Sequence, residues 1–369
     1  MKIDVNQARW FRFCQSGLNQ PFESSEACAT QLLGVQAQIL NAGAIALWNR
    51  LEEFSLSDFQ DLLYTQKTLV KLWGQRKTIH LYTTQDWPTI HKAFVDTPSW
   101  WKRKIKDPKE LAAFDKALDS VVKLLKKEKT LNRALVRDSK LKIPEALTSS
   151  WGGLFMDLVF HGHACHGQRK GNQGCFVHRE HWVPNLEWTP PTELAAKQWL
   201  AQQYFQTYGP ATIHDFAYWA GGKVTVMREV VKSLGDKLVE VNYGAQAHWI
   251  WHTMATELQK NAPSNAQWPT RLLYRFDPLL LPHKDKSWLI EEQYYKSVWK
   301  KAAVIDAVIL IAGQIKGTWK YTRKGKRLLI ELMPFKPLSK GILQKLEKEA
   351  FRIASFLEYP KEQVIVSVL

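Results

Sequence analysis

The stretch "YGPATIHDFAYWAGGKVTVMREVVKSLGDKLVEVNYG", residues 208–244, predicts two helices followed by a strand. Thr212 and Asp215 are spaced as an N-cap and the acid that completes it, and Gly221 predicts the end of the first helix. Apolar residues at helical spacing then fill 224–234, and the following "KLVEV" alternates as a strand does. Helix, turn, helix and strand in this order predict a winged helix.

Two segments upstream repeat this order without alignable identity. In the first, Ser57 and Gln60 form a predicted capping box, and 68–83 has the pattern of two strands joined by a basic turn near Gly74. In the second, 129–183, a helical pattern precedes strands around a glycine-rich interior, which predicts a long wing. The amino-terminal half therefore predicts two further helix–helix–hairpin units.

From about residue 270 the pattern changes to short strands. The stretch 302–335 is apolar and broken at Gly313, Gly317 and Gly325, as expected for a small antiparallel sheet or barrel, and 339–359 has the pattern of an amphipathic helix. The predicted fold class is α+β, with three tandem winged helices and a small C-terminal antiparallel β-barrel. The predicted domains are 1–90, 91–190, 191–262 and 270–369.

The composition is that of a globular protein with a polyanionic partner. The 369 residues suffice for about two to three domains, and no run approaches the ~18 apolar residues of a membrane span. The formal net charge of +16 favours nucleic acid over an anionic membrane surface as the partner. Four cysteines and an amino terminus unlike a secretion leader lead us to expect a reducing cytoplasm.

Two further patterns bear on ligands. Three basic runs, 100–106, 123–129 and 320–327, are each typical of a solvated face but together favour salt-dependent phosphate contacts. The segment 161–181 is rich in potential zinc ligands, yet their spacing matches no standard zinc motif and an irregular wing tip explains the same residues. We therefore expect no metal or other cofactor. The potential ligands are His161, His163, Cys165, His166, Cys175, His178 and His181.

The stretch "GVQAQILNAG", residues 34–43, places Gln36 and Gln38 in an apolar run. A buried amide is costly unless it is hydrogen-bonded, so the pair needs an explanation. If Gly34 ends the preceding helix, the segment is extended and both amides face the same side. Alternatively, the two glutamines cap the following helix or bond to backbone within the core.

Five blocks in order resemble the tandem winged-helix DNA glycosylases that unhook interstrand crosslinks, the AlkZ-like and YcaQ-like family. The blocks are "LLGVQAQ…LWNRL", "LWGQRKTIHL", "YGPATIHDFAYWAG", "RFDPLLLPHKDKSWLI" and "IAGQIKGTW". The resemblance implies that Gln36-Ala37-Gln38 is the catalytic Gln–apolar–Gln motif of the AlkZ-like branch. It also implies a C-shaped molecule with a concave DNA-binding surface.

The resemblance also points to residues that contact DNA. The family's Trp-x-x-Arg-Gly-Thr-x-His signature appears with lysine where glycine is usual, and its histidine is equally well explained as a hydrogen-bonded core residue. The signature residues are Trp73, Arg76, Lys77, Thr78 and His80. Further candidates open the third recognition helix, occupy the "HKDKS" stretch or mark a basic hairpin. They are Thr212, His214, His283, Lys284, Lys286, Lys320, Arg323, Lys324 and Arg327.

Neutral amides suffice when the leaving base is already cationic, because no acid is needed and the amide oxygens hold water and face the developing sugar cation. We therefore predict a monofunctional DNA glycosylase, without a Schiff-base lysine in its motif, that acts on N7-alkylguanine and N3-alkyladenine but not on uracil. The predicted substrates include bulky adducts and interstrand crosslinks.

The expected state is a cytoplasmic, bacterial-type nucleoid-associated monomer bound to double-stranded DNA and not to membranes. A non-enzymatic winged-helix regulator and a zinc-dependent nucleic-acid enzyme are the alternatives.

Overall fold

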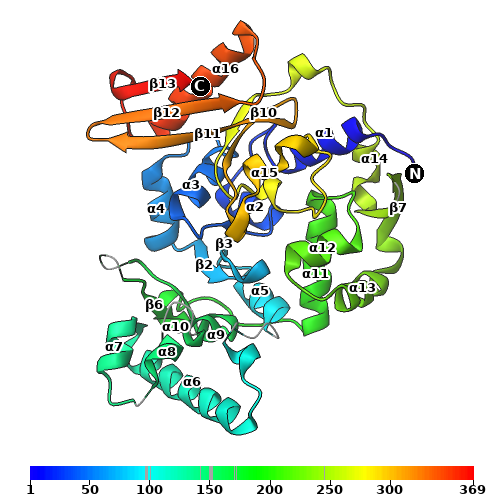
Figure 1. Ribbon diagram of the computed structural model, residues 1–369. Coiled ribbons are helices and arrows are strands. Elements are labelled where there is room, and N and C mark those ends of the chain that lie inside the picture. Colours follow the sequence, from blue (N-terminus) through cyan, green and yellow to red (C-terminus); the bar gives the residue numbers. More distant parts are fainter. Residues whose placement is uncertain are drawn as a thin grey trace. The chain divides into compact units, whose positions relative to one another are not determined.

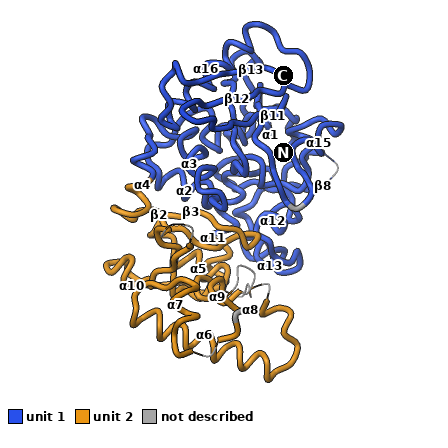
Figure 2. The backbone as a smooth tube through the Cα atoms, turned by 60° about the vertical axis from the view of Figure 1, so that its left-hand side comes forward, with its two compact units in different colours: residues 1–59, 200–369 blue, residues 60–199 orange. Residues whose placement is uncertain are grey.

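Two stretches far apart in sequence, 1–59 and 200–369, build one structural unit, unit 1, and the residues between them, 60–199, build unit 2 (Figure 2). The computed structural model describes residues 1–95, 99, 101–141, 143–148, 153–169, 171, 173–244 and 246–369. Trp100 of the predicted basic run 100–106, and residues 142, 149–152, 170 and 172 of the predicted second unit 129–183, lie outside this description.

Unit 1 is a mixture of helices and strands (Figure 1). Its amino-terminal elements are α1 (Val5–Gln15), α2 (Ser25–Gln31), β1 (Val35–Gln36) and α3 (Leu40–Trp48). The later elements are α12 (Ile213–Ala220), α13 (Val224–Ser233), β7 (Leu238–Tyr243), β8 (Gln246–Trp251), α14 (Ala255–Leu258), β9 (Arg271–Leu273), α15 (Tyr295–Val298), β10 (Ala307–Ile311), β11 (Gln314–Lys324), β12 (Arg327–Pro334), α16 (Lys340–Phe356) and β13 (Val364–Val368). Helices α4 (Leu56–Tyr64) and α11 (Glu193–Thr207) cross the boundaries between the units.

The segment that predicts the fold, 208–244, has the expected elements. Thr212 Oγ1 accepts the backbone N–H of Asp215 at 3.0 Å, and Asp215 Oδ2 accepts that of Thr212 at 3.0 Å, which is the predicted capping box of α12. Gly221 ends the helix at φ +73°, a conformation that glycine adopts without strain. Helix α13 and the antiparallel β7–β8 hairpin follow, so the predicted helix, helix and strand are confirmed.

The carboxyl-terminal strands form one five-stranded sheet in the order β13-β12-β11-β10-β9. All neighbours are antiparallel except β12 and β13, which run parallel. The predicted break at Gly317 is wrong, because β11 runs through it. A Cβ there would lie 2.6 Å from the carbonyl oxygen of Met333 on the paired strand, so close approach explains this glycine. The predicted helix of 339–359 is α16, which packs beside β13 (Figure 1).

Helix α1 joins two hydrophobic cores within unit 1. Phe11 and Ala8 pack with the β7–β8 hairpin and α14. Phe13 packs with the segment around Trp268 and with strand β10. Since the helix buries aromatic side chains on both sides, it connects the start of the chain to two elements encoded more than two hundred residues later.

Unit 2 contains one long helix, a hairpin and a small sheet. The hairpin strands are β2 (Leu69–Trp73) and β3 (Ile79–Thr83), and the sheet has the order β4-β6-β5. The other elements are α5 (Trp87–Phe94), α6 (Pro108–Glu128), β4 (Thr130–Leu131), α7 (Arg133–Asp138), α8 (Glu145–Thr148), α9 (Leu154–Phe160), β5 (Ala164–His166), β6 (Phe176–His178) and α10 (Arg179–Trp182). Helix α6 buries a stripe at spacings of four and three: Phe114, Leu118, Val121 and Leu125.

The predicted capping box of Ser57 and Gln60 is wrong. Helix α4 begins two residues earlier, where the N–H of Asp58 donates to Ser55 Oγ at 3.1 Å and the N–H of Ser55 donates to Asp58 Oδ2 at 2.8 Å. Asp58 is charged and completes the box better than a neutral glutamine does. Within the described part of the chain, no helix is long and apolar enough to cross a membrane.

Candidate functional site

The glutamine motif follows a helix end that turns the chain sharply. The backbone N–H of Gly34 donates to the carbonyl of Ala29 at 2.8 Å, and that of Leu33 donates to Thr30 at 3.0 Å. This is the Schellman pattern, and both Leu33 (φ +56°) and Gly34 (φ +87°) are left-handed. Val35 and Gln36 then form the short strand β1, so the predicted helix end and the start of an extended segment are confirmed.

The two glutamines differ in exposure. Gln36 is buried, with 5% of its surface exposed, whereas Gln38 is exposed. Helix α3 begins directly afterwards at Leu40, and its N-cap residue is Ile39, whose side chain forms no cap hydrogen bond. The motif therefore places one amide inside the protein and one at its surface, immediately before a helix.

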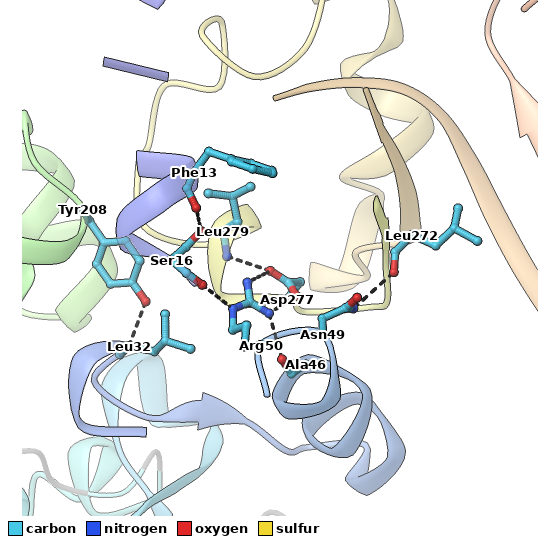
Figure 3. Close-up of polar contacts among 10 residues, drawn as sticks. All are labelled: Phe13, Ser16, Leu32, Ala46, Asn49, Arg50, Tyr208, Leu272, Asp277 and Leu279. Atoms are coloured by element: carbon cyan, nitrogen blue, oxygen red, sulfur yellow. Dashed lines mark hydrogen bonds and ion pairs between the residues drawn. The ribbon is translucent and has the colours of Figure 1, made fainter. Parts of the chain in front are cut away.

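Side chains at the end of α11 and directly after it fix the chain before the motif. Tyr208 Oη donates to the carbonyl of Leu32 at 2.8 Å (Figure 3), and Thr207 Oγ1 donates to the carbonyl of Gln31 at 2.7 Å. These two carbonyls lie at the end of α2, where the last carbonyl groups of a helix have no hydrogen-bond partner within the helix. The entry to the motif is thus held by hydrogen bonds to a segment far along the chain.

A buried ion pair fixes the chain after the motif. Arg50 donates to Asp277 through Nη1 at 2.8 Å and Nη2 at 2.7 Å, and both side chains are at most 1% exposed (Figure 3). Arg50 also donates to the carbonyls of Ser16 at 2.6 Å and Ala46 at 2.9 Å, the latter at the end of α3. Burial lowers the pKa of Arg50, but the carboxylate of Asp277 outweighs it and raises the pKa overall. Bidentate pairing makes this a rigid joint.

The sequence blocks contain this ion pair, but their pattern did not single it out. Arg50 closes "LWNRL" and Asp277 lies in "RFDPLLLP". A charged residue inside an apolar block was the available signal, since such residues are almost never fully buried without a partner. Asn49, its neighbour, adds a hydrogen bond to the carbonyl of Leu272 at 3.2 Å (Figure 3).

Three of the predicted DNA contacts in unit 1 line one cavity of about 830 Å³: Thr212, His214 and Lys284. The backbone N–H of Lys284 donates to Asp215 Oδ1 at 2.8 Å, which joins the "HKDKS" stretch to the start of α12. Cavity-lining residues that the sequence did not single out as contacts include Gln246 and His248 on β8.

Two predicted contacts are buried instead. His283 is 3% exposed and pairs through Nε2 with the carbonyl oxygen of Tyr208 at 2.8 Å, and burial lowers its pKa well below the usual value. Lys286 is 4% exposed, and its ammonium donates to the carbonyl of His283. Both side chains are thus buried and form hydrogen bonds within the protein, and their direct contact with DNA stays a prediction.

The four predicted hairpin cations lie on β11 and β12 and are exposed: Lys320, Arg323, Lys324 and Arg327. Lys324 and Arg327 face each other in register beside the turn at Gly325. Lys320 pairs with Glu331 at 3.2 Å. The hairpin end therefore concentrates positive charge at the surface of unit 1.

In unit 2 the signature residues surround the β2–β3 turn. Arg76 and Lys77 both have left-handed backbone, with φ +56° and +58°, and are half-buried. Lysine thus keeps the conformation that suits the glycine usual at this place. Burial and the nearby Arg103 lower the pKa of Lys77 to about 8. Thr78 Oγ1 donates to the carbonyl of Gln75 at 3.1 Å.

His80 and Trp73 are packed within unit 2. His80 is 1% exposed, its Nδ1 lies 3.0 Å from the carbonyl oxygen of Thr78, and burial lowers its pKa well below the usual value. The structure thus places His80 as a buried, hydrogen-bonded core histidine, and its direct contact with DNA stays a prediction. Trp73 is half-buried and stacks on Phe176, with centroids 5.8 Å apart.

The sequence placed this turn near Gly74 but did not single out the contacts that shape it. Gln75 is buried and accepts a hydrogen bond from Tyr82 Oη. A Cβ on Gly74 would lie 1.7 Å from the same hydroxyl, so only glycine fits there. No group of three or more metal-ligating side chains is placed to hold an ion among the residues described, and His166 of the histidine-rich segment instead packs on Trp73.

Comparisons with known proteins agree with this arrangement. Residues 29–356 match the family model described as DNA glycosylase AlkZ-like. The chain is 26% identical to the interstrand DNA cross-link repair glycosylase of Streptomyces sahachiroi, over 88% of each chain. Its fold is similar to that of the solved Streptomyces sahachiroi DNA glycosylase AlkZ, with a TM-score of 0.83, 23% identity and full coverage of both chains.

Proposed function

The chain belongs to the AlkZ-like DNA glycosylase family and is an enzyme that acts on DNA, and we propose that it hydrolyses the N-glycosidic bond of cationic alkylated purines. The proposed substrates are N7-alkylguanine and N3-alkyladenine in duplex DNA, including bulky adducts and interstrand crosslinks. The name of its Streptomyces sahachiroi relative, an interstrand cross-link repair glycosylase, supports the last of these. The protein acts as a monofunctional, cytoplasmic monomer that needs no cofactor.

The chemistry follows from the neutrality of the motif. Gln36 and Gln38 cannot take a full proton near neutral pH, so they cannot act as the carboxylates of a conventional glycosidase do. A purine alkylated at N7 already carries a positive charge and leaves as a neutral base. The protein then has only to hold a water below C1′ and to direct carbonyl dipoles toward the developing sugar cation.

The observation that carries the proposal is the fixed, half-exposed motif. Gln38 is exposed, so DNA can reach it, whereas Gln36, two residues earlier, is buried. The chain is held before the motif at Leu32 and after it by Arg50. Groups held this way pay little reorganisation cost when charge develops, which is the condition for electrostatic catalysis by neutral dipoles.

DNA is held by the tandem units that the sequence predicts: winged helices at 1–90, 91–190 and 191–262 and a barrel at 270–369. Thr212, His214 and Lys284 around the cavity supply phosphate contacts. The exposed cations of the β11–β12 hairpin and the half-buried Arg76 and Lys77 of unit 2 supply others. The net charge of +16 supports a strongly salt-dependent affinity.

The test is excision of a single N7-methylguanine from a duplex, followed by alkaline cleavage of the abasic product. Gln36→Ala and Gln38→Ala are each expected to lower the single-turnover rate by about 10²–10³, the usual loss for a preorganised dipole. Gln60→Ala, which removes an exposed glutamine of α4, is the matched control and keeps the wild-type rate. Addition of chelator leaves all rates unchanged.

Three outcomes would contradict the proposal. If the duplex with N7-methylguanine stays intact after incubation with wild-type protein, the substrate assignment is wrong. Equal rates for wild type and both motif variants remove the catalytic role of the glutamines. Activity that disappears with chelator returns the histidine- and cysteine-rich segment 161–181 to consideration as a zinc site.

A further inference from the structure

A hydrogen bond links a pair of tyrosines to the helix that follows the glutamine motif. Asn41, in the first turn of α3, follows Gln38 by three residues, and its Nδ2 donates to Tyr321 Oη of β11 at 3.5 Å. With successive Cα atoms 3.8 Å apart, this hydroxyl is at most about 18 Å from the backbone of Gln38. A single DNA substrate can therefore contact both.

The two rings form a stacked pair on a buried support. Tyr274 and Tyr321 have centroids 5.3 Å apart with 30° between their planes. Beneath them Trp319 is 2% exposed, lies 5.5 Å from the ring of Tyr274, and donates through Nε1 to the carbonyl of Leu273 at 2.9 Å. Both tyrosines are half-buried, so part of each residue reaches solvent.

The environment of the pair favours the neutral form of Tyr274. Burial, with the neighbouring Tyr321 as the next cause, raises the pKa of Tyr274 above its usual value. Nearby cations have other neighbours: Arg275 lies 3.6 Å from Asp306, and Arg323 lies over the ring of Tyr359. The π electrons of an aromatic ring attract a cation.

We propose that this tyrosine pair, Tyr274 and Tyr321, is a binding subsite that stacks on the cationic alkylated base and so recognises its positive charge. The proposal rests on the proposed function, since amide catalysis requires a base that is already cationic. A nucleobase stacked on an aromatic side chain gains about 1–3 kcal/mol, and a positive charge adds a cation–π component. The subsite therefore selects the lesions that the glutamines are able to release.

The test measures binding rather than cleavage. One duplex carries 2′-fluoro-N7-methylguanosine, which is cationic and resists hydrolysis, and the other carries 2′-fluoro-7-methyl-7-deazaguanosine, its neutral isostere. Wild-type protein is expected to bind the cationic duplex about 3- to 30-fold more tightly, the range of a cation–π contact. Tyr321→Leu reduces this ratio to near one, whereas Tyr321→Phe, which keeps the ring, retains it within about twofold.

The controls separate recognition from structure. Tyr294→Leu removes a tyrosine that stacks on Phe335, and it leaves the ratio unchanged. Tyr321→Thr, which suits a strand, gives the same test if the leucine variant does not fold. An unchanged affinity ratio in the leucine and threonine variants overturns the subsite. A ratio near one in the phenylalanine variant also overturns it, because the hydroxyl contact with Asn41 would then be the cause.

The binding assay is independent of turnover. A wild-type protein that prefers the cationic duplex but excises nothing supports the subsite and contradicts the proposed reaction. A wild-type protein that excises N7-methylguanine but binds both duplexes equally overturns the subsite and leaves the reaction intact.

Discussion

At the scale of single residues, Lys77 joins an uncommon backbone conformation to a lowered pKa of about 8. Its amine is charged below that pH and neutral above it, so its contribution to DNA binding is lost as pH rises from 7 to 9. We expect wild-type affinity for an undamaged duplex to fall over this range, as measured by fluorescence anisotropy at fixed salt. Lys77→Arg keeps its charge and flattens the profile. Lys324→Arg, at an exposed hairpin position, leaves the fall unchanged. A Lys77→Arg profile as steep as the wild type would exclude this lysine as the source.

At the scale of one element, the β2–β3 turn depends on contact between Gly74 and Tyr82. In Gly74→Ala the new methyl group would lie 1.7 Å from the tyrosine hydroxyl, which would have to leave Gln75. We expect a loss of about 1–3 kcal/mol in the free energy of unfolding, the usual cost of overpacking, together with weaker DNA binding. Urea denaturation measures the first and anisotropy the second. Gly341→Ala, in the first turn of α16 with nothing within 4 Å, is the control and is neutral or slightly stabilising. Wild-type stability in Gly74→Ala would show that the turn adapts.

At the scale of the whole molecule, the Arg50–Asp277 pair joins the two chain segments of unit 1. Arg50→Met leaves the Asp277 carboxylate buried without its partner, and we expect a loss of about 3–5 kcal/mol, measured by urea denaturation. The double variant Arg50→Met, Asp277→Leu should regain part of it, because no buried charge is left unpaired. Arg137→Ala, which breaks an ion pair whose partners are 67% and 66% exposed, should cost less than about 1 kcal/mol. A single variant no less stable than this control would show that the pair is not a structural joint.

Predictions from the sequence were more accurate where interactions between residues close in sequence determine the structure. The capping box of Thr212 and Asp215 was predictable because a local pattern fixes it. The sequence "SLSDFQ" contains two overlapping patterns of the same kind, so local spacing did not distinguish Ser55 from Ser57. Gly317 was predicted to break a strand because propensity is local, whereas its actual role is set by a neighbouring strand.

The same limit applies to the site. The glutamine motif was found from its spacing and from the family resemblance, because both are written within a few residues. Arg50 and Asp277 are 227 residues apart, and no local signal links them. The burial of His283 and Lys286 likewise depends on tertiary packing, since "HKDKS" alone has the composition of a solvated loop.

The interruption of unit 1 by residues 60–199 has a consequence for biosynthesis. A ribosome that adds about 5–20 residues per second needs roughly 10–45 s to proceed from Arg50 to Asp277, which are 227 positions apart. During that interval unit 2 is translated completely and is free to fold, while the glutamine segment has emerged but lacks the acid that closes its support. On the proposed function, we expect the nascent enzyme to be inactive until translation is well past its midpoint, and a fragment that ends before Asp277 to lack activity.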